Sequence, residues 1–461
     1  MHVIHHPEEA ICAAHLPPGT GIYAAGNAAT PQVLLRQLAQ ATEIRDVDLY
    51  SVLPLGDDLE DLFSEDRCRS LTHRVIFNSH LTREAVNRGR AKYLPWHLSE
   101  ISRHLSRPGG PSVVLATVSG PDKGGNYSLG TTVEAVWGAI QAAKQRGGIV
   151  IAERNAQMPF VLGTTIPGST IDYLLETDYP LPRSPVHSPD ETARRIGEII
   201  AALYIRDGSG SEPGSTLQYG IGEVPDAVTE AILARGYRDL GIHTELFSDA
   251  MIRLVQQGAV TNRWQGLGFS VSSIFLSGTP EGYAWLDYNS SVQSRPCEYT
   301  NSVFRIAEQP RMVAVNSAIG VDIQGNIWAD SLDARKIYSG VGGQSDFIRG
   351  AQHSEDGVAI IAMKSTTSGG LPKVVERCPA GITTTAIPAD QVILVTEYGA
   401  FDPRGRSLGE RGVGIAHLAP PVQREHLLQV IANDPAFHWR DRTPHRGVPG
   451  FTPYAEAVAR G

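Results

Sequence analysis

The stretch STLQYGIGEVPDAVTEAILARG, residues 215–236, decides the fold class. It begins with a strand-like apolar run, turns through the triplet GIG at 220–222, and continues as a helical segment with Pro225 near its start. Glycine permits a sharp turn, and proline is favoured in the first turn of a helix. A strand that runs through a glycine turn into a helix is the repeating unit of α/β proteins. We therefore predict an α/β fold.

The same alternation continues along the chain on both sides of this stretch. Short β-branched runs are separated by amphipathic segments, which is typical of open, mostly parallel sheets covered by helices. Helices are predicted over 132–147, which stops at a pair of glycines, and over 190–204, with Asp190 as the N-cap. Strands are predicted over 112–118, 148–153, 215–221, 311–317, 357–363 and 391–398.

A proline-rich segment marks the best domain boundary. The window YPLPRSPVHSPDE (179–191) contains four prolines and cannot continue a helix or a central strand. A chain of 461 residues is also long for a single core. We predict two α/β domains, residues 1–185 and residues 186–461.

Composition and charge exclude several function classes. The chain is 41% hydrophobic and 19% charged, as in an ordinary folded protein, and its net charge of -9 with no basic cluster argues against binding to nucleic acid or an anionic membrane. No apolar run approaches the ~18 residues of a membrane span, and the N-terminal residues lack the basic and apolar regions of a signal peptide. We expect a soluble cytoplasmic protein.

The four cysteines, Cys12, Cys68, Cys297 and Cys378, are far apart and form no CxxC pair. Their spacing argues against a zinc knot or a disulfide scaffold and suits a reducing compartment. The chain also has no His/Cys/Asp grouping with the spacing of metal ligands. No metal is therefore expected.

Glu245 is the first candidate for chemistry. The run DLGIHTE (239–245) is predicted to be a strand that ends at this glutamate, and Ser248 or Asp249 is better placed to cap the helix that follows. In open α/β sheets, residues just past the carboxyl end of a strand line the ligand site. The residues alone leave a functional and a structural role for Glu245 equally open.

Two glycine-rich loops are candidates for binding a ligand. The GIG triplet is not a dinucleotide fingerprint, because Pro225 stands where the third glycine of GxGxxG is required. It is either a ligand loop or a structural turn. The second loop, YSGVGGQSDFIRG (338–350), has three glycines within four positions, and such a loop can bring backbone amides to a developing negative charge. The alternative is a flexible surface loop.

Eight segments, taken in chain order, resemble the acetyl-CoA hydrolase/transferase family, which includes 4-hydroxybutyrate and acetate CoA-transferases. They are YLPWHLSEI (93–101), GPDKGGNYSLGTTV (120–133), IAERNAQMP (151–159), STLQYGIGEVPDAV (215–228), DLGIHTELFSDAMIRLVQQGAVTN (239–262), VNSAIGVDIQGNIWADS (315–331), YSGVGGQSDFIRGA (338–351) and VTEYGAFDPRGRSLGER (395–411).

The resemblance implies two α/β domains with the site in the cleft between them and Glu245 as a covalent nucleophile. Coenzyme A is then a substrate, no prosthetic group is expected, and the protein is expected to be a homo-oligomer. The residues that the resemblance assigns to coenzyme A are Gly220, Ile221, Gly222, Glu223, Val224, Ile319, Gly340, Gly342 and Gly343.

The implied activity is ping-pong transfer of CoA between short acids such as acetate, propionate, butyrate or 4-hydroxybutyrate. Two alternatives remain, namely hydrolysis of acyl-CoA at the same glutamate and binding of CoA without turnover. A nicotinamide dehydrogenase is disfavoured by the failed fingerprint. The segment 268–302 matches the family only loosely, and this departure bears on the identity of the substrate more than on the type of reaction.

Overall fold

The computed structural model describes residues 1–334, 336–437 and 447–460. Its first half forms an eight-stranded sheet in which every neighbouring pair of strands is parallel. Across the sheet the strands are β1 (His2–Ile4), β10 (Tyr173–Thr177), β8 (Ile149–Asn155), β6 (Val113–Val118), β2 (Gly21–Ala24), β3 (Val47–Val52), β4 (Leu71–Phe77) and β5 (Lys92–Tyr93).

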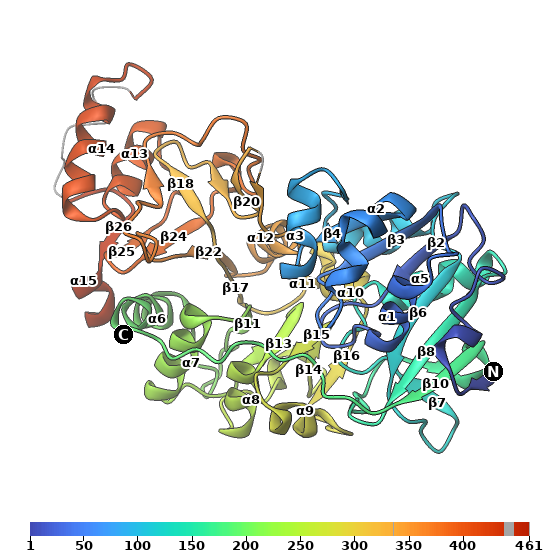
Figure 1. Ribbon diagram of the computed structural model, residues 1–461. Coiled ribbons are helices and arrows are strands. Elements are labelled where there is room, and N and C mark those ends of the chain that lie inside the picture. The colour runs from blue at the N-terminus through green and yellow to red at the C-terminus, as the bar shows by residue number, and fades with distance from the viewer. Residues whose placement is uncertain (335, 438–446, 461) are drawn as a thin grey trace.

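The second half forms a seven-stranded sheet, which runs from the left to the centre of Figure 1. Its first five strands are parallel and its last two pairings are antiparallel. The order is β12 (Gly241–Ile242), β11 (Thr216–Tyr219), β17 (Met312–Asn316), β22 (Val358–Ala362), β24 (Ile393–Thr396), β25 (Gly399–Phe401) and β26 (Phe451–Pro453). These mostly parallel sheets confirm the predicted fold class.

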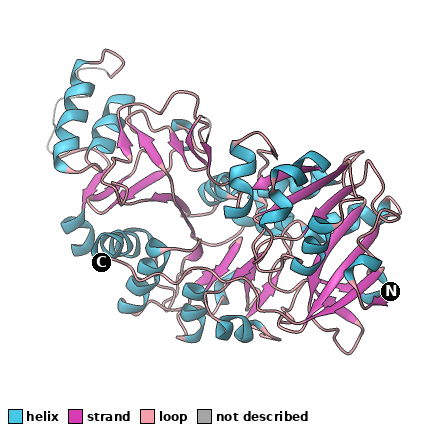
Figure 2. Cartoon of the chain, in the orientation of Figure 1, coloured by secondary structure: helices cyan, strands magenta, loops and turns pink. Residues whose placement is uncertain are grey.

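Helices flank the strands of both sheets (Figure 2). Parallel strands covered on both faces bury all their side chains, and β6 is buried along its whole length. The helices are α1 (Gln32–Gln40), α2 (Glu65–Ser70), α3 (His80–Asn87), α4 (Ile101–Leu105), α5 (Val136–Gln145), α6 (Glu191–Tyr204), α7 (Glu223–Ala234), α8 (Asp249–Gln256), α9 (Pro280–Leu286), α10 (Cys297–Thr300), α11 (Val303–Ala307), α12 (Gln344–His353), α13 (Leu408–Ala416), α14 (Pro421–Asn433) and α15 (Tyr454–Ala459).

Further short strands lie outside the two main sheets. They are β7 (Asn126–Ser128), β9 (Thr165–Pro167), β13 (Leu246–Ser248), β14 (Ser270–Ser272), β15 (Ile274–Leu276), β16 (Val292–Ser294), β18 (Gly320–Asp322), β19 (Ile327–Trp328), β20 (Ser331–Asp333), β21 (Lys336–Ile337) and β23 (Val374–Val375). Strands β13 to β16 lie between the main sheets (Figure 1). Two isolated β-bridges, Thr132 with Ile274 and Gly163 with Ser294, join this region to the first half.

Most predicted elements are confirmed within a few residues. The Asp190 cap is also confirmed, because its carboxylate accepts a hydrogen bond of 2.8 Å from the N–H of Ala193. The helix predicted from residue 132 begins instead at Val136. The preceding residues are held out of the helix, since the N–H groups of Val133 and Glu134 donate to the carbonyl of Ser273. A contact between distant segments overrides the local helical pattern there.

The strand predicted over 239–245 is wrong in its extent. Strand β12 ends at Ile242, and Glu245 lies three residues beyond that end, directly before β13. The capping prediction is also wrong in detail. Ser248 occupies the N-cap position of α8 but its side chain makes no capping bond, while Asp249 accepts a hydrogen bond of 2.5 Å from the hydroxyl of Ser277.

The segment 178–190 between the sheets contains neither helix nor strand. One hydrophobic core nevertheless includes residues of both halves, among them Met158, Leu181, Leu217 and Phe247. The boundary at residue 185 stays a prediction. Within the part of the chain that the structure describes, no helix is long and apolar enough to cross a membrane.

Candidate active site

The main chain of Glu245 is fixed by four hydrogen bonds to one carbonyl oxygen. The N–H groups of Ile274 and Ser273 donate at 2.8 and 3.2 Å, and the hydroxyls of Ser272 and Ser273 donate at 3.0 and 3.1 Å. Glu245 lies in the short segment that runs from the end of β12 to the start of β13. The position of the Glu245 backbone is therefore set by the 272–274 segment, and the bond from Ile274 belongs to the pairing of β13 with β15.

The carboxylate of Glu245 faces an amide and a glycine. Asn301 Nδ2 donates to Oε2 at 2.8 Å, and the hydroxyl of Thr300 donates to Asn301 Oδ1 at 2.8 Å, which fixes the amide nitrogen toward the carboxylate. A Cβ at Gly343 would lie 1.7 Å from Glu245 Oε2 and 2.1 Å from Asn301 Nδ2. Only glycine fits at position 343 beside this carboxylate.

Burial is the largest cause that raises the pKa of Glu245, and the shift brings it to about 7. The nearby charge of Asp346 raises the pKa further, whereas the hydrogen bond from Asn301 lowers it. Asp346 belongs to α12 and accepts hydrogen bonds from the N–H and the hydroxyl of Ser99, at 3.2 and 2.8 Å. A glutamate that titrates near neutral pH between two halves of a chain is a candidate for chemistry.

The second glycine loop is anchored to the first half of the chain. A Cβ at Gly340 would lie 2.6 Å from the carbonyl oxygen of Ile76, and one at Gly342 would lie 3.2 Å from the ring of Phe77, both at the end of β4. The N–H of Leu98 also donates to the carbonyl of Gly342 at 3.0 Å. These contacts argue against a flexible surface loop, because they hold the loop beside Glu245.

The GIG loop lies at the carboxyl end of β11, whose neighbour β12 leads to Glu245. Gly222 has a φ of 120° and is the N-cap of α7. The side chain of Glu223 accepts a hydrogen bond from Lys364 Nζ, which also donates to Asp190 at 2.8 Å. Ile221 is 41% exposed, which leaves the loop open to a ligand.

Ile319 follows β17, which pairs with β11 on the side opposite to β12. Its N–H donates to the carbonyl of Trp328 at 2.9 Å, so this donor is used within the protein. The structure thus gathers Gly342 and Gly343 at Glu245 and holds Gly340 at the end of β4. The rest of the predicted set follows β11 and β17, namely Gly220, Ile221, Gly222, Glu223, Val224 and Ile319. Their roles toward coenzyme A stay predictions.

Sequence reasoning missed the polar contacts of Glu245. Asn301 lies 56 positions from Glu245 in the chain, and no local motif marks either it or the serines of the 272–274 segment. All of them belong to the region 268–302. Only folding brings that region to the glutamate.

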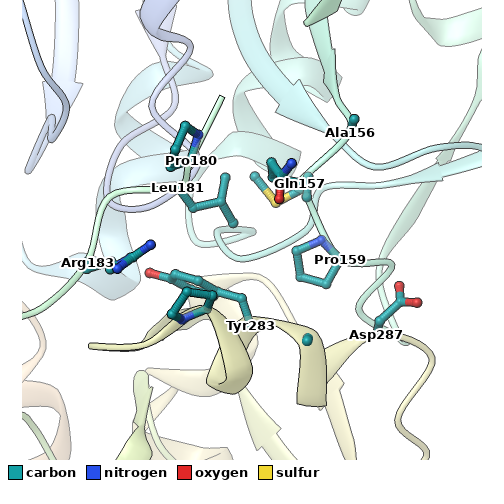
Figure 3. Close-up of a pocket in the computed structure, with 11 residues that line it drawn as sticks. Ala156, Gln157, Pro159, Pro180, Leu181, Arg183, Tyr283 and Asp287 are labelled. Carbon is teal, nitrogen blue, oxygen red and sulfur yellow. The ribbon is translucent and has the colours of Figure 1, made fainter. Parts of the chain in front are cut away.

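A separate pocket lies where the two halves meet below the linking segment (Figure 3). The side chains of Leu181, Pro159 and Tyr283 surround it, and the Tyr283 hydroxyl donates to the carbonyl of Pro182 at 2.5 Å. Glu245 does not line this pocket. Among residues 1–334, 336–437 and 447–460, no cluster of His, Cys, Asp or Glu is placed to hold a metal ion.

Comparison with known proteins identifies the family of the chain. Residues 3–182 match the acetyl-CoA hydrolase/transferase N-terminal domain, and residues 278–431 match its C-terminal domain. A succinyl-CoA:acetate/propanoyl-CoA:succinate CoA transferase from Fasciola hepatica is 35% identical over 89% of this chain and 84% of the relative. A 4-hydroxybutyrate coenzyme A transferase from Clostridium kluyveri is 37% identical over 78% of this chain and 82% of the relative.

The crystal structure of RipA from Yersinia pestis matches the fold with a TM-score of 0.84, covering 94% of this chain and 97% of that chain at 29% identity. The sequence matches and the fold therefore agree over most of the chain. The chain belongs to the acetyl-CoA hydrolase/transferase family and is a CoA-transferase.

Proposed function

We propose that the chain transfers coenzyme A between an acyl-CoA and a short carboxylate such as acetate, propionate, butyrate or 4-hydroxybutyrate, through covalent intermediates on Glu245. The observation that carries the proposal is the setting of this carboxylate. It has a pKa near 7, a side-chain amide donor at 2.8 Å, and a glycine loop against which no larger residue fits.

The reaction begins when the Glu245 carboxylate attacks the carbonyl carbon of the acyl-CoA thioester. The C–S bond breaks, CoA leaves as a thiolate, and an acyl-glutamyl anhydride forms. The thiolate then attacks the carbonyl carbon of Glu245, which releases the first carboxylate and leaves a glutamyl-CoA thioester. A second carboxylate reverses these two steps. Activation is conserved because both intermediates remain acyl donors.

Each attack places negative charge on a carbonyl oxygen. Asn301 Nδ2 and the N-terminal end of α12, which begins after Gly343, both face the Glu245 carboxylate. Donors and helix N-termini placed in advance stabilise such a charge without reorganising. Asn301 therefore both orients the nucleophile and stabilises the tetrahedral states formed at the Glu245 carbonyl.

Replacing Asn301 by alanine should lower kcat about 10²-fold and leave the Kd for CoA little changed, because one oxyanion donor is lost while the CoA loops remain. Steady-state rates together with calorimetric CoA binding measure the two effects separately. Asn433→Ala, exposed at the end of α14, is the matched control. A wild-type kcat in the Asn301 variant would remove this residue from the mechanism.

The rate should fall on the acid side of pH 7. Attack requires the anion of Glu245, and burial raises its pKa to about 7, so protonation withdraws the nucleophile as the pH drops. We expect kcat/KM for acyl-CoA to fall about tenfold per pH unit below 7. Asp346→Asn should move this limb to lower pH, because the charge of Asp346 raises the pKa of Glu245. An acid limb near pH 4.5 would contradict the assignment.

The proposal is tested by supplying one acyl-CoA with a different carboxylate and following the new acyl-CoA by mass spectrometry. Formation of the exchanged thioester supports transfer. Release of free CoA at the same rate without an acceptor would favour the hydrolase alternative, in which water reaches the intermediates. Binding of CoA without either product would favour the non-catalytic alternative.

A further inference from the structure

Glu134 is a second buried glutamate close to the site, and the reaction above does not use it. Its side chain is fully buried in the first half of the chain. The hydroxyl of Tyr23, on β2, donates to Oε1 at 2.9 Å, and Asn27 Nδ2 lies 3.3 Å from Oε2. Both partners are uncharged. A buried carboxyl group with only neutral partners needs an explanation.

The backbone of Glu134 is joined to that of Glu245 through a single residue. The N–H groups of Val133 and Glu134 donate to the carbonyl of Ser273 at 2.9 and 3.2 Å. The N–H and the hydroxyl of Ser273 in turn donate to the carbonyl of Glu245. The main chain of Glu134 is therefore separated from that of Glu245 by one hydrogen-bonded residue, Ser273.

No positive charge faces Glu134 within the described part of the chain. The titratable groups around it are Tyr23 of β2, Cys297 and Glu298 of α10, and Glu245. Burial raises the pKa of Glu134 to about 8, and the charge of Glu245 raises it as well. Both groups on α10 are acidic, so neither stabilises an anion at position 134.

We propose that Glu134 is a positioning residue of the transfer site that works in its protonated, uncharged form. Its main-chain N–H group holds Ser273, and the lack of charge on its side chain keeps a further anion away from Glu245 and the incoming acceptor carboxylate. This inference rests on the proposed function of Glu245. Ionisation of Glu134 at alkaline pH would repel the acceptor and weaken its binding.

The test is the pH profile of kcat/KM for the acceptor carboxylate. In the wild type we expect a fall of about tenfold per pH unit above 8. Glu134→Gln keeps an uncharged group of the same shape, so its kcat/KM should stay constant above pH 8. Its kcat at pH 7 should be lower by about fivefold, because one hydrogen bond is altered. Glu425 is exposed on α14, so Glu425→Gln should show the same fall of kcat/KM above pH 8 as the wild type. An alkaline limb shared by wild type and Glu134→Gln would overturn the proposal.

Tyr23→Phe provides a second variant with a directional outcome. The Tyr23 hydroxyl stabilises the anion of Glu134 and lowers its pKa. Removing the hydroxyl should move the alkaline limb to higher pH, by an amount read from the same profile. A loss of activity that is equal at all pH values would indicate a structural role only, and it would overturn the proposal.

Infrared difference spectroscopy separates this inference from the proposed function, because it requires no turnover. Wild type minus Glu134→Gln at pH 7 should show the carbonyl stretch of a protonated carboxylic acid. Absence of this band would overturn the protonated state of Glu134. A wild type that shows the band but transfers no CoA would instead refute the proposed function and, with it, the positioning role.

Discussion

Glu245→Ala should abolish CoA transfer, with kcat lower by about 10⁴-fold or more, the scale observed when a covalent nucleophile is removed. The side chain supplies the attacking oxygen, and none of its contacts can replace it. Asn301 is an amide and Gly343 has no side chain. Initial rates of thioester exchange measure the effect, and Glu425→Gln serves as the matched control on an exposed helix.

The same variant should still fold and bind CoA, because the 272–274 segment holds the backbone of residue 245 and not its side chain. Trapping gives a direct readout of the intermediate. After incubation with acyl-CoA and borohydride, the peptide containing GIHTELFSD should carry an alcohol at residue 245 in the wild type and no change in the variant. A folded Glu245→Ala variant with wild-type rates would remove Glu245 from the mechanism.

Gly343→Ala should lower kcat by about 10³-fold without unfolding the protein. The added methyl group would lie 1.7 Å from Glu245 Oε2 and 2.1 Å from Asn301 Nδ2. Both groups must then move by more than 1 Å, and a displacement of about 1 Å alone can cost 10²-fold. Loss of the oriented amide adds to this effect. Rates measured beside a circular dichroism spectrum separate a local clash from a global loss of structure.

Gly210→Ala is the matched control for this substitution. Gly210 is exposed in the loop before β11, and a Cβ there would meet nothing within 4 Å. It should therefore keep wild-type rates. Equal activity in Gly343→Ala and Gly210→Ala would show that the carboxylate of Glu245 does not lie against the second glycine loop during the reaction.

The sequence predicted the elements of the fold well where local pattern controls them. The six β-branched runs all contain strands of the two sheets, and the helix after Asp190 begins where its cap predicts. Such elements follow from side-chain periodicity and from groups close in the chain. The prediction fails at 132–135 and at 243–245, because those residues bond to the 271–275 segment, which is distant in the chain.

The sequence by itself determined the α/β class, the proline-rich link between the sheets, and the presence of two glycine-rich loops. Only the tertiary structure decided the pKa and the orientation of Glu245. Its pKa depends on burial and on Asp346, and its orientation depends on Asn301 and on the serines of the 272–274 segment. Electrostatic free energy depends on distance in space and on loss of water, and separation along the chain encodes neither.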